Sequence, residues 1–170
     1  MRLLGLYNEL EYVPNRLEGY NFNLEMLGKS IQLCLCDGPV YQLAKGQIVP
    51  PRSYLSDTLV LLCFSIDDRG SLEHVERMWS PRRPGEEQRG RLSLPILLVG
   101  CKMDVREDHK ALERTIRYQC GTISTEQGKA VAKRIGASMY LECSAKTGNG
   151  VHEVFYHGAR LYLFSQRATK

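Results

Sequence analysis

Three short, unbroken apolar runs constrain the fold of this chain more than any other feature. They span residues 59–66, 95–100 and 139–143. Each run is short, shows little alternation between apolar and polar residues, and is followed by polar residues. This pattern is typical of strands that are covered on both faces. The runs therefore predict central strands of a parallel sheet.

Segments with the period of a helix lie between and after these runs. They are residues 71–78, 109–117, 125–135 and 151–164. Ser124 precedes the third segment and Gln127 follows three residues later, which predicts a capping box at the start of a helix. Strands that alternate with helices predict an α/β fold built on a doubly wound, mostly parallel sheet.

The remaining segments predict one sheet edge and two loops. A glycine turn separates residues 20–27 from residues 30–35, and apolar and polar residues partly alternate along both segments. This pattern predicts an antiparallel hairpin at an edge of the sheet. Residues 38–53 and 81–93 are rich in proline, glycine or charge, and we expect loops there. No repeat or composition shift marks a second domain, so residues 1–170 are expected to form a single domain.

Composition and charge argue against several classes of function. The net charge of +4 is spread over alternating basic and acidic residues, so we expect no nucleic acid partner. The cysteines are Cys34, Cys36, Cys63, Cys101, Cys120 and Cys143. They form no CxxC pair or Cys/His spacing, which favours buried free thiols over a metal site or disulfides. The chain has no secretory leader pattern and no apolar run that could span a membrane, so we expect a cytoplasmic, intracellular protein.

Two polar loops follow the second and third apolar runs. They read Cys101-Lys-Met-Asp104 and Cys143-Ser-Ala-Lys146. Ligands of such sheets bind beyond the carboxyl ends of the strands, so both loops are expected to face one crevice. A carboxylate such as Asp104 can accept two adjacent N–H groups from guanine, an edge that adenine lacks. Each string alone is more often an ordinary solvated loop, but their joint order after two buried strands indicates a guanine slot.

These loops resemble the base-reading loops of small GTPases, which read Asn/Thr-Lys-x-Asp and Ser-Ala-Lys. The resemblance implies that the stems of Lys102 and Lys146 lie across the two faces of the base. It also implies that the backbone N–H of Ala145 meets the guanine carbonyl and that Ser144 steadies the loop. Cys101 departs from the pattern, because it stands where the family has Asn or Thr and a thiol is a poor hydrogen-bond partner.

Further strings narrow the resemblance to the Rho proteins, over most positions from 12 to 158. The strings are Ser53-Tyr-Leu-Ser-Asp-Thr58, Cys63-Phe-Ser-Ile-Asp67, Ser71-Leu-Glu73, Trp79 and Tyr140-Leu-Glu-Cys-Ser-Ala-Lys146. Tyr12-Val-Pro14, with Glu18 and Tyr20, is similar to the Rho switch I segment, and residues 106–119 resemble the extra helix of Rho proteins. The resemblance implies a P-loop NTPase-like fold of the small-GTPase type, with Rho regulators or effectors as partners.

The phosphate-binding half of the resemblance is not found in the sequence. The family's phosphate loop reads GxxxxGK[ST], and the 170 residues contain no such string. Leu3, Tyr7 and Leu10 follow a helical spacing, so the first residues resemble the remnant of the first helix. The first strand and the phosphate loop would then precede Met1. We therefore expect an N-terminally truncated domain whose sheet is missing its first strand.

The nucleotide switch positions are also degenerate. Tyr12 and Pro14 are kept, but Asn15 stands where the switch I Thr would bind Mg²⁺ and the γ-phosphate. After Asp37 the family reads Thr-Ala-Gly-Gln, whereas Val40-Tyr41 takes the Gly and Gln positions in this chain. We therefore expect no catalytic residue, weak binding of GTP or GDP, impaired hydrolysis and no dependable Mg²⁺ site.

The last residues, Gln166-Arg-Ala-Thr-Lys170, lack the prenylated CaaX Cys of Rho proteins, so no stable membrane anchor is expected. We expect a monomer.

Three hypotheses of function remain open at this point. The chain is a Rho-type guanine-nucleotide-binding protein of signal transduction, a pseudo-GTPase that acts as an interaction module, or a truncated product without activity.

Overall fold

The computed structural model describes the backbone of residues 2–6, 18–26, 28–37, 42–43, 47–48, 58–79, 95–108 and 121–168. Side chains are described for residues 20–26, 28–35, 58–79, 95–108 and 121–165. Several predictions lie outside the described residues. They concern Tyr12, Pro14, Asn15, Val40, Tyr41, the loop at 81–93, the helix at 109–117 and residues 109–119 of the Rho-like helix at 106–119.

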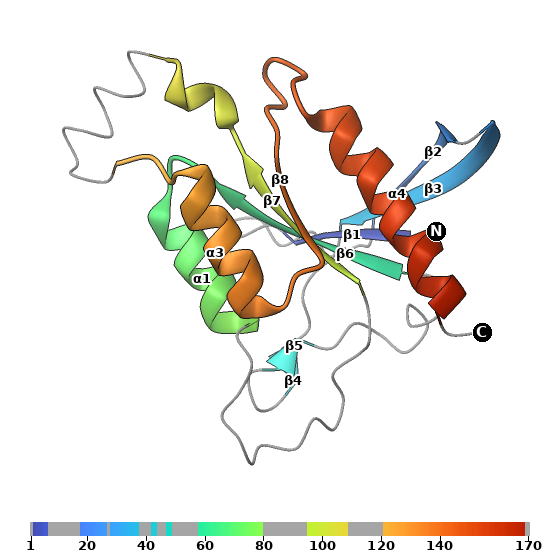
Figure 1. Cartoon of the computed structure of the whole chain (residues 1–170), viewed down its shortest axis with the longest axis horizontal. Helices are drawn as coiled ribbons and strands as arrows, with labels where there is room; N and C mark the ends of the chain where they lie inside the picture. The colour runs from blue at the N-terminus through green and yellow to red at the C-terminus, as the bar shows by residue number, and fades with distance from the viewer. Residues whose placement is uncertain are drawn as a thin grey trace.

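A six-stranded sheet forms the centre of the fold (Figure 1). Its strands are β1 (Arg2–Leu6), β2 (Glu18–Met26), β3 (Lys29–Asp37), β6 (Thr58–Ser65), β7 (Ile96–Cys101) and β8 (Met139–Glu142). They lie in the order β2-β3-β1-β6-β7-β8, and every neighbouring pair is parallel except the hairpin β2-β3 at the edge. The mostly parallel sheet and its antiparallel edge hairpin are therefore confirmed. The third apolar run forms β8 at the opposite edge, which corrects the prediction of a central strand there.

The first strand of the sheet is present, which corrects the prediction that it would be missing. Residues Arg2–Leu6 form β1, which lies between β3 and β6 and pairs in parallel with both. The helical spacing of Leu3, Tyr7 and Leu10 therefore predicts the wrong element at residues 2–6. A gap between β3 and β6 would leave two rows of backbone N–H and C=O groups unpaired, and β1 satisfies both rows.

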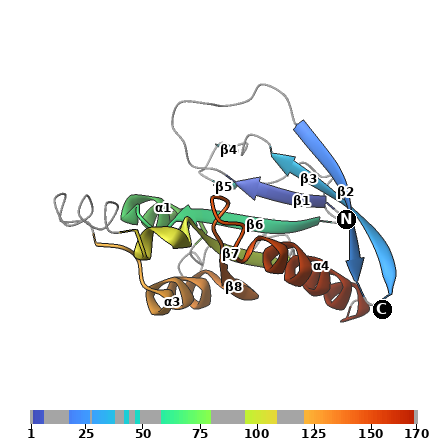
Figure 2. The ribbon, with the colours of Figure 1, turned by 90° about the horizontal axis from the view of Figure 1, so that it is seen from above.

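Helices cover both faces of the sheet, as the apolar runs predict. They are α1 (Arg69–Trp79), the 3₁₀ turn η2 (Met103–Arg106), α3 (Thr125–Ile135) and α4 (Val151–Ala168). Along β6, Val60 and Leu62 pack into the cluster that includes α1 and α3, whereas Leu59 and Leu61 pack into the cluster that includes α4. Helices α1 and α3 lie side by side, and α4 lies apart from them (Figures 1 and 2). Because both faces of β6 are buried, apolar and polar residues do not alternate along this strand.

Local signals place the helix starts well. Ser124 Oγ accepts a hydrogen bond from Gln127 N at 3.3 Å, and Gln127 Oε1 accepts one from Ser124 N at 2.9 Å, so the predicted capping box of α3 is confirmed.

A two-stranded hairpin, β4 (Gln42–Leu43) with β5 (Gln47–Ile48), lies within the stretch at 38–53 that was expected to be a loop, which corrects that part of the prediction. No helix in the described part of the chain is long and apolar enough to cross a membrane.

Candidate guanine-binding site

The two predicted base-reading loops lie next to each other at the carboxyl ends of β7 and β8. Backbone hydrogen bonds tie them together: Cys143 N donates to Gly100 O at 2.9 Å, and Met103 N donates to Cys143 O at 3.0 Å. Strands β7 and β8 are parallel, so their carboxyl ends emerge at the same edge of the sheet. The sheet itself therefore brings together two loops that are about forty residues apart in the chain.

Asp104 is the polar centre of the paired loops. The Ser144 hydroxyl, which is fully buried, donates a hydrogen bond of 2.5 Å to Asp104 Oδ1. The ammonium of Lys146 lies 3.7 Å from the other oxygen, Oδ2. The Asp104 side chain keeps 16% of its surface exposed, so it is held in place while it still faces solvent. A carboxylate fixed in this way can accept two parallel N–H donors from a ligand.

Lys102 and Lys146 flank this carboxylate. Both side chains are mostly exposed, and they provide long apolar stems beside Asp104. Lys102 has φ 61°, a left-handed conformation that is costly for a residue with a side chain. Backbone strain of this kind is common where a loop must present a ligand-binding group, because packing around the loop compensates for its cost. The two loops therefore present an accessible carboxylate together with two exposed lysine side chains.

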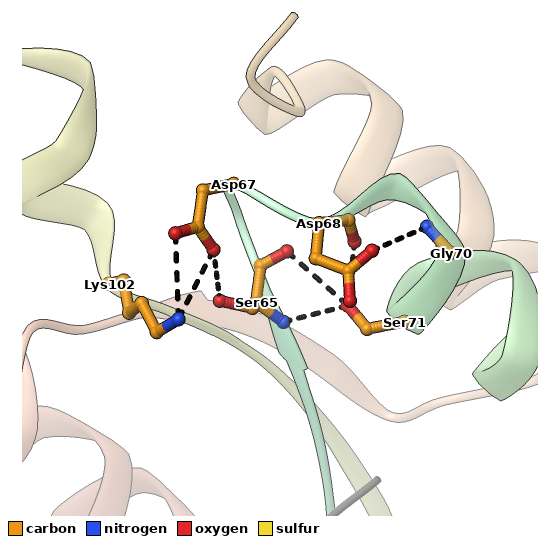
Figure 3. A network of polar contacts seen from close by, with 6 residues as sticks. All are labelled: Ser65, Asp67, Asp68, Gly70, Ser71 and Lys102. Carbon is orange, nitrogen blue, oxygen red and sulfur yellow. Dashed lines mark hydrogen bonds and ion pairs between the residues drawn. The ribbon is translucent and has the colours of Figure 1, made fainter. Parts of the chain in front are cut away.

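The ammonium of Lys102 contacts a third segment, the turn between β6 and α1 (Figure 3). It lies 3.4 Å from Asp67 Oδ1 and 3.5 Å from Asp67 Oδ2. The Ser65 hydroxyl also donates a hydrogen bond to Asp67 Oδ1. The ion pair is partly exposed, so it contributes little to stability. Its consequence is positional, because Asp67 holds the end of the Lys102 side chain that would lie over the base.

Ser71 holds the same turn from the side of α1 (Figure 3). Its Oγ accepts a hydrogen bond from Ser65 N at 2.9 Å and donates one to Asp68 O at 2.7 Å. Asp68 Oδ1 in turn accepts a hydrogen bond from Gly70 N at 2.9 Å, which satisfies one N–H of the first turn of α1. Ser71 is buried, so water does not easily replace its hydrogen bonds to the turn that carries Asp67.

We expect Ser71→Ala to lower the free energy of unfolding by about 1–3 kcal/mol, because it leaves the Ser65 N–H without an acceptor beside the core. Urea unfolding followed by circular dichroism measures the change. Ser65→Ala is the matched control, since it removes a hydroxyl from the same turn but leaves every backbone group paired. An equal decrease in the free energy of unfolding of the two variants would contradict the role of Ser71 as the acceptor for the Ser65 N–H.

The loop that follows β8 is closed by its own backbone. Ser144 N donates to Asn149 O at 2.8 Å, and Gly148 N donates to Ser144 O at 2.9 Å. Thr147 N donates to Ser144 Oγ at 3.2 Å, so this hydroxyl accepts from its own loop while it donates to Asp104. Ala145 and Lys146, at the tip of the loop, are exposed. Ser144 therefore steadies both loops, and the tip is left accessible to a ligand.

Three thiols lie close to the two loops, on the face of the sheet that α4 covers. They belong to Cys63, Cys101 and Cys143, all of which are free and only partly buried. A hydrogen bond with Cys143 favours the thiolate of Cys101, but the hydrogen bond with Cys63 and burial outweigh it and raise the pKa of Cys101 to about 12. The hydrogen bond with Cys101, together with burial, also raises the pKa of Cys143. Both thiols stay neutral at physiological pH and fill space between the loops and α4.

The raised pKa of Cys101 predicts that the folded protein loses stability at alkaline pH. The unfolded chain releases the thiol proton near its ordinary pKa of 9.0, whereas the folded chain keeps it up to about 12. The thiol's contribution to stability is therefore complete below about pH 9 and is lost as the pH rises towards 12. We expect wild type to lose more stability than Cys101→Ala between pH 8 and pH 10.5 in urea unfolding. Parallel losses in the two proteins would contradict the raised pKa.

The other predicted positions are only partly described. Asp37 ends β3, at the same end of the sheet as the two loops, but its side chain lies outside the described part. Tyr12, Pro14, Asn15, Val40 and Tyr41 lie outside it as well. Among the side chains that the structure describes, no group of three or more His, Cys, Asp or Glu residues could hold a metal ion.

Sequence reasoning missed residues that position the loops. Asp67 contacts Lys102, and Asp108 Oδ2 lies 3.6 Å from Lys146 Nζ. Arg106 and Glu142 form an ion pair just outside the two motifs. Asp67 and Glu142 stand inside strings that resemble Rho proteins, so a signal was present, but the strings do not say which side chains meet. Those contacts depend on the register of neighbouring strands.

Comparisons with known proteins agree over almost the whole chain. The model of the Ras family matches residues 17–163. GTP-binding protein RHO1 of Candida albicans is 40% identical over 163 residues, which cover 94% of this chain and 77% of that protein. GTP-binding protein rho1 of Schizosaccharomyces pombe is 38% identical over 96% of this chain and 77% of its own length. GTP-binding protein rho5 of the same yeast is 41% identical over 92% of this chain and 74% of its own length.

Proposed function

This chain belongs to the Ras family of small GTPases and, within it, to the Rho proteins, and from that membership we propose that it binds a guanine nucleotide through the slot around Asp104. The observation that carries the proposal is the position of the Asp104 carboxylate. The Ser144 hydroxyl holds it by a hydrogen bond of 2.5 Å, and the same two loops carry the exposed side chains of Lys102 and Lys146. The base is recognised by Asp104, with the stems of Lys102 and Lys146 on its two faces and Ala145 at its carbonyl.

We further propose that base recognition is not coupled to efficient hydrolysis. Asn15, Val40 and Tyr41 stand at the switch positions where the family uses Thr, Gly and Gln. Each of these groups stabilises the phosphate charge or orients the attacking water, and losing one typically costs orders of magnitude in rate. Binding by this chain therefore rests on the base and depends little on Mg²⁺.

Isothermal titration with GDP tests the proposal directly. We expect saturable binding with a Kd between about 10 μM and 1 mM, because base contacts contribute only part of the free energy of nucleotide binding. The Kd should be similar in Mg²⁺ and in EDTA, and ADP should bind at least about tenfold more weakly. No heat at about 1 mM GDP would overturn the proposed function. Strong tightening by Mg²⁺ would overturn only the part that concerns phosphate.

A second function, an interaction module for Rho regulators or effectors, is favoured by one specific observation. Tyr12-Val-Pro14 keeps the switch I pattern that partners contact in the family, although the hydrolytic positions beside it are changed. A pull-down with a Tyr12→Ala/Pro14→Ala variant tests this function. Recovery of the same partners by wild type and variant would count against it. A cooperative melt by circular dichroism would exclude the remaining hypothesis of a truncated product that does not fold.

A further inference from the structure

Arg106 and Glu142 flank the base-reading motifs symmetrically along the chain. Arg106 follows Asp104 by two residues, and Glu142 precedes Ser144 by two residues. The two side chains meet across the gap between the loops: Arg106 Nη1 donates to Glu142 Oε2 at 2.6 Å, and Nη2 donates to Oε1 at 2.9 Å. This fork of two parallel hydrogen bonds fixes direction as well as distance, so it sets how the loops lie relative to each other.

The same guanidinium also holds a third segment. Arg106 Nε and Nη2 donate to the backbone oxygen of Ile123, at 3.2 Å and 2.6 Å, just before α3 begins. Ile123 itself is buried, and its N–H donates to Ile66 O at 2.9 Å. A single arginine side chain therefore connects the turn after β7, the entry to α3 and the end of β8.

Tyr140 completes the cluster from within β8. Its hydroxyl donates a hydrogen bond of 2.6 Å to Glu142 Oε1. The chain makes room for this ring: a Cβ built on Gly128 of α3 would lie 2.3 Å from the ring, and one built on Gly100 of β7 would lie 2.8 Å from the hydroxyl. Two glycines on two different elements thus leave space for one tyrosine, which indicates that its position is constrained.

The charges in the cluster are well shielded from water. The side chains of Arg106 and Glu142 are 26% and 12% exposed. Burial alone would raise the pKa of Glu142, but hydrogen bonds from Arg106 and Tyr140 outweigh it and hold that pKa below its usual range. The pair therefore stays ionised at neutral pH, and removing either partner leaves a poorly solvated charge.

We propose that Arg106 and Glu142, supported by Tyr140, are positioning residues that hold the two base-reading loops in their nucleotide-binding arrangement. The proposal rests on the guanine-binding function proposed above. None of these side chains needs to touch the nucleotide. They act through Asp104 and Ser144, which lie two residues away on either side of the gap.

The chain offers a matched control pair. Arg134 of α3 forms a similar two-point ion pair with Glu76 of α1, in which Nη2 donates to Oε2 at 3.1 Å and Nε donates to Oε1. This pair is more exposed, at 52% and 32%, and it joins two helices instead of the two loops. Substitutions of Arg134 therefore repeat the chemical change without altering the base-reading loops.

The test compares Arg106→Lys and Glu142→Gln with Arg134→Lys and Glu76→Gln by amide hydrogen exchange without nucleotide. Lysine keeps the charge and loses the fork, whereas glutamine keeps the shape and loses the charge. We expect exchange in residues 101–108 and 143–149 to accelerate by about tenfold in the first two variants, while β6 exchanges as in wild type. Both control variants should leave these two loops unchanged.

GDP titration of the same four variants adds a functional readout. We expect the Kd for GDP to rise by about tenfold or more in Arg106→Lys and Glu142→Gln and to stay within about twofold in the controls. If wild type does not bind GDP, the proposed function fails, and the exchange data still decide whether the pair positions the loops.

Unchanged loop exchange in Arg106→Lys would overturn the positioning role, and so would equal acceleration in the loops and in β6. If Arg106→Lys and Glu142→Gln do not fold, Tyr140→Phe takes their place, because it removes one hydrogen-bond donor to Glu142 and keeps the ring. The same pattern of loop exchange is then expected at a smaller amplitude, and a wild-type pattern in Tyr140→Phe would overturn the proposal.

Discussion

Gly150→Ala is expected to destabilise the protein by about 2–5 kcal/mol, more than most single substitutions do. Gly150 has φ 73°, where a residue with a Cβ is strained. A Cβ at this position would also lie 2.2 Å from Glu142 O and 3.1 Å from Cys143 Cα. Both neighbours are backbone atoms, in the last residue of β8 and in the residue after it, so they cannot move aside without disturbing the sheet.

Gly148→Ala provides the control, because it separates backbone strain from steric conflict. Gly148 has φ 81° in the same loop, but a Cβ there would meet nothing within 4 Å. We expect it to cost only the left-handed conformation, about 1–2 kcal/mol. Urea unfolding followed by circular dichroism measures both variants. Similar losses at the two positions would show that close approach to Glu142 is not what requires glycine at 150.

The close approach at Gly150 matters for the site because it joins the Ser-Ala-Lys loop to α4. Gly150 O accepts the N–H of Val154 at 3.1 Å, in the first turn of the helix. The same residue lies against the last residues of β8, from which the loop leaves. Substitution at this position therefore displaces either the helix or the loop that carries Ser144, and we expect nucleotide binding to fall together with stability.

Asp104→Asn is expected to weaken GDP binding by about 10²–10³-fold and to shift preference towards xanthine nucleotides. In the proposed binding mode the carboxylate accepts both N–H donors of guanine, whereas an amide presents one acceptor and one donor. The amide donor would then face the guanine amino group, which is also a donor. Xanthine carries a carbonyl in place of that amino group, so it can accept a hydrogen bond from the amide. Competition titrations of GDP and xanthosine diphosphate measure the change in preference.

Asp108→Asn is the matched control for this prediction. The Asp108 carboxylate contacts Lys146, as Asp104 does, but it lies outside the base-reading motif. The substitution makes the same change in charge, so we expect GDP affinity to stay within about threefold of wild type. Thermal melts of both variants verify that they fold. Equal GDP affinity in wild type and Asp104→Asn would refute the assignment of the base to this carboxylate.

The sequence alone predicted the elements whose residues report on their own surroundings. Unbroken apolar runs predicted β6 and β7, because a strand buried on both faces has no polar side. The third run also forms a strand, β8, but this strand is only partly buried and lies at the edge of the sheet. The Ser124 capping box predicted the start of α3, because both of its hydrogen bonds are local. The two base-reading strings predicted that Asp104 and Ser144 lie close together, because parallel strands end at one edge of the sheet.

The sequence did not predict features that depend on partners far along the chain. The spacing of Leu3, Tyr7 and Leu10 favours a helix, but residues 2–6 form β1 because β3 and β6 present unpaired backbone on both sides. Local propensity is weak compared with two rows of backbone hydrogen bonds, so the tertiary pairing decides the element.

The same distinction applies to the site. The strings around Asp104 and Ser144 specify a chemistry, namely a carboxylate and a hydroxyl beside two lysines. The contacts of Lys102 with Asp67 and of Arg106 with Glu142 join residues about 35 positions apart. Such contacts exist only once the register of β6, β7 and β8 is set, because a shift of one residue would turn each side chain to the opposite face. The sequence by itself indicated which groups are expected to read a base, and the tertiary structure decided which side chains hold those groups in place.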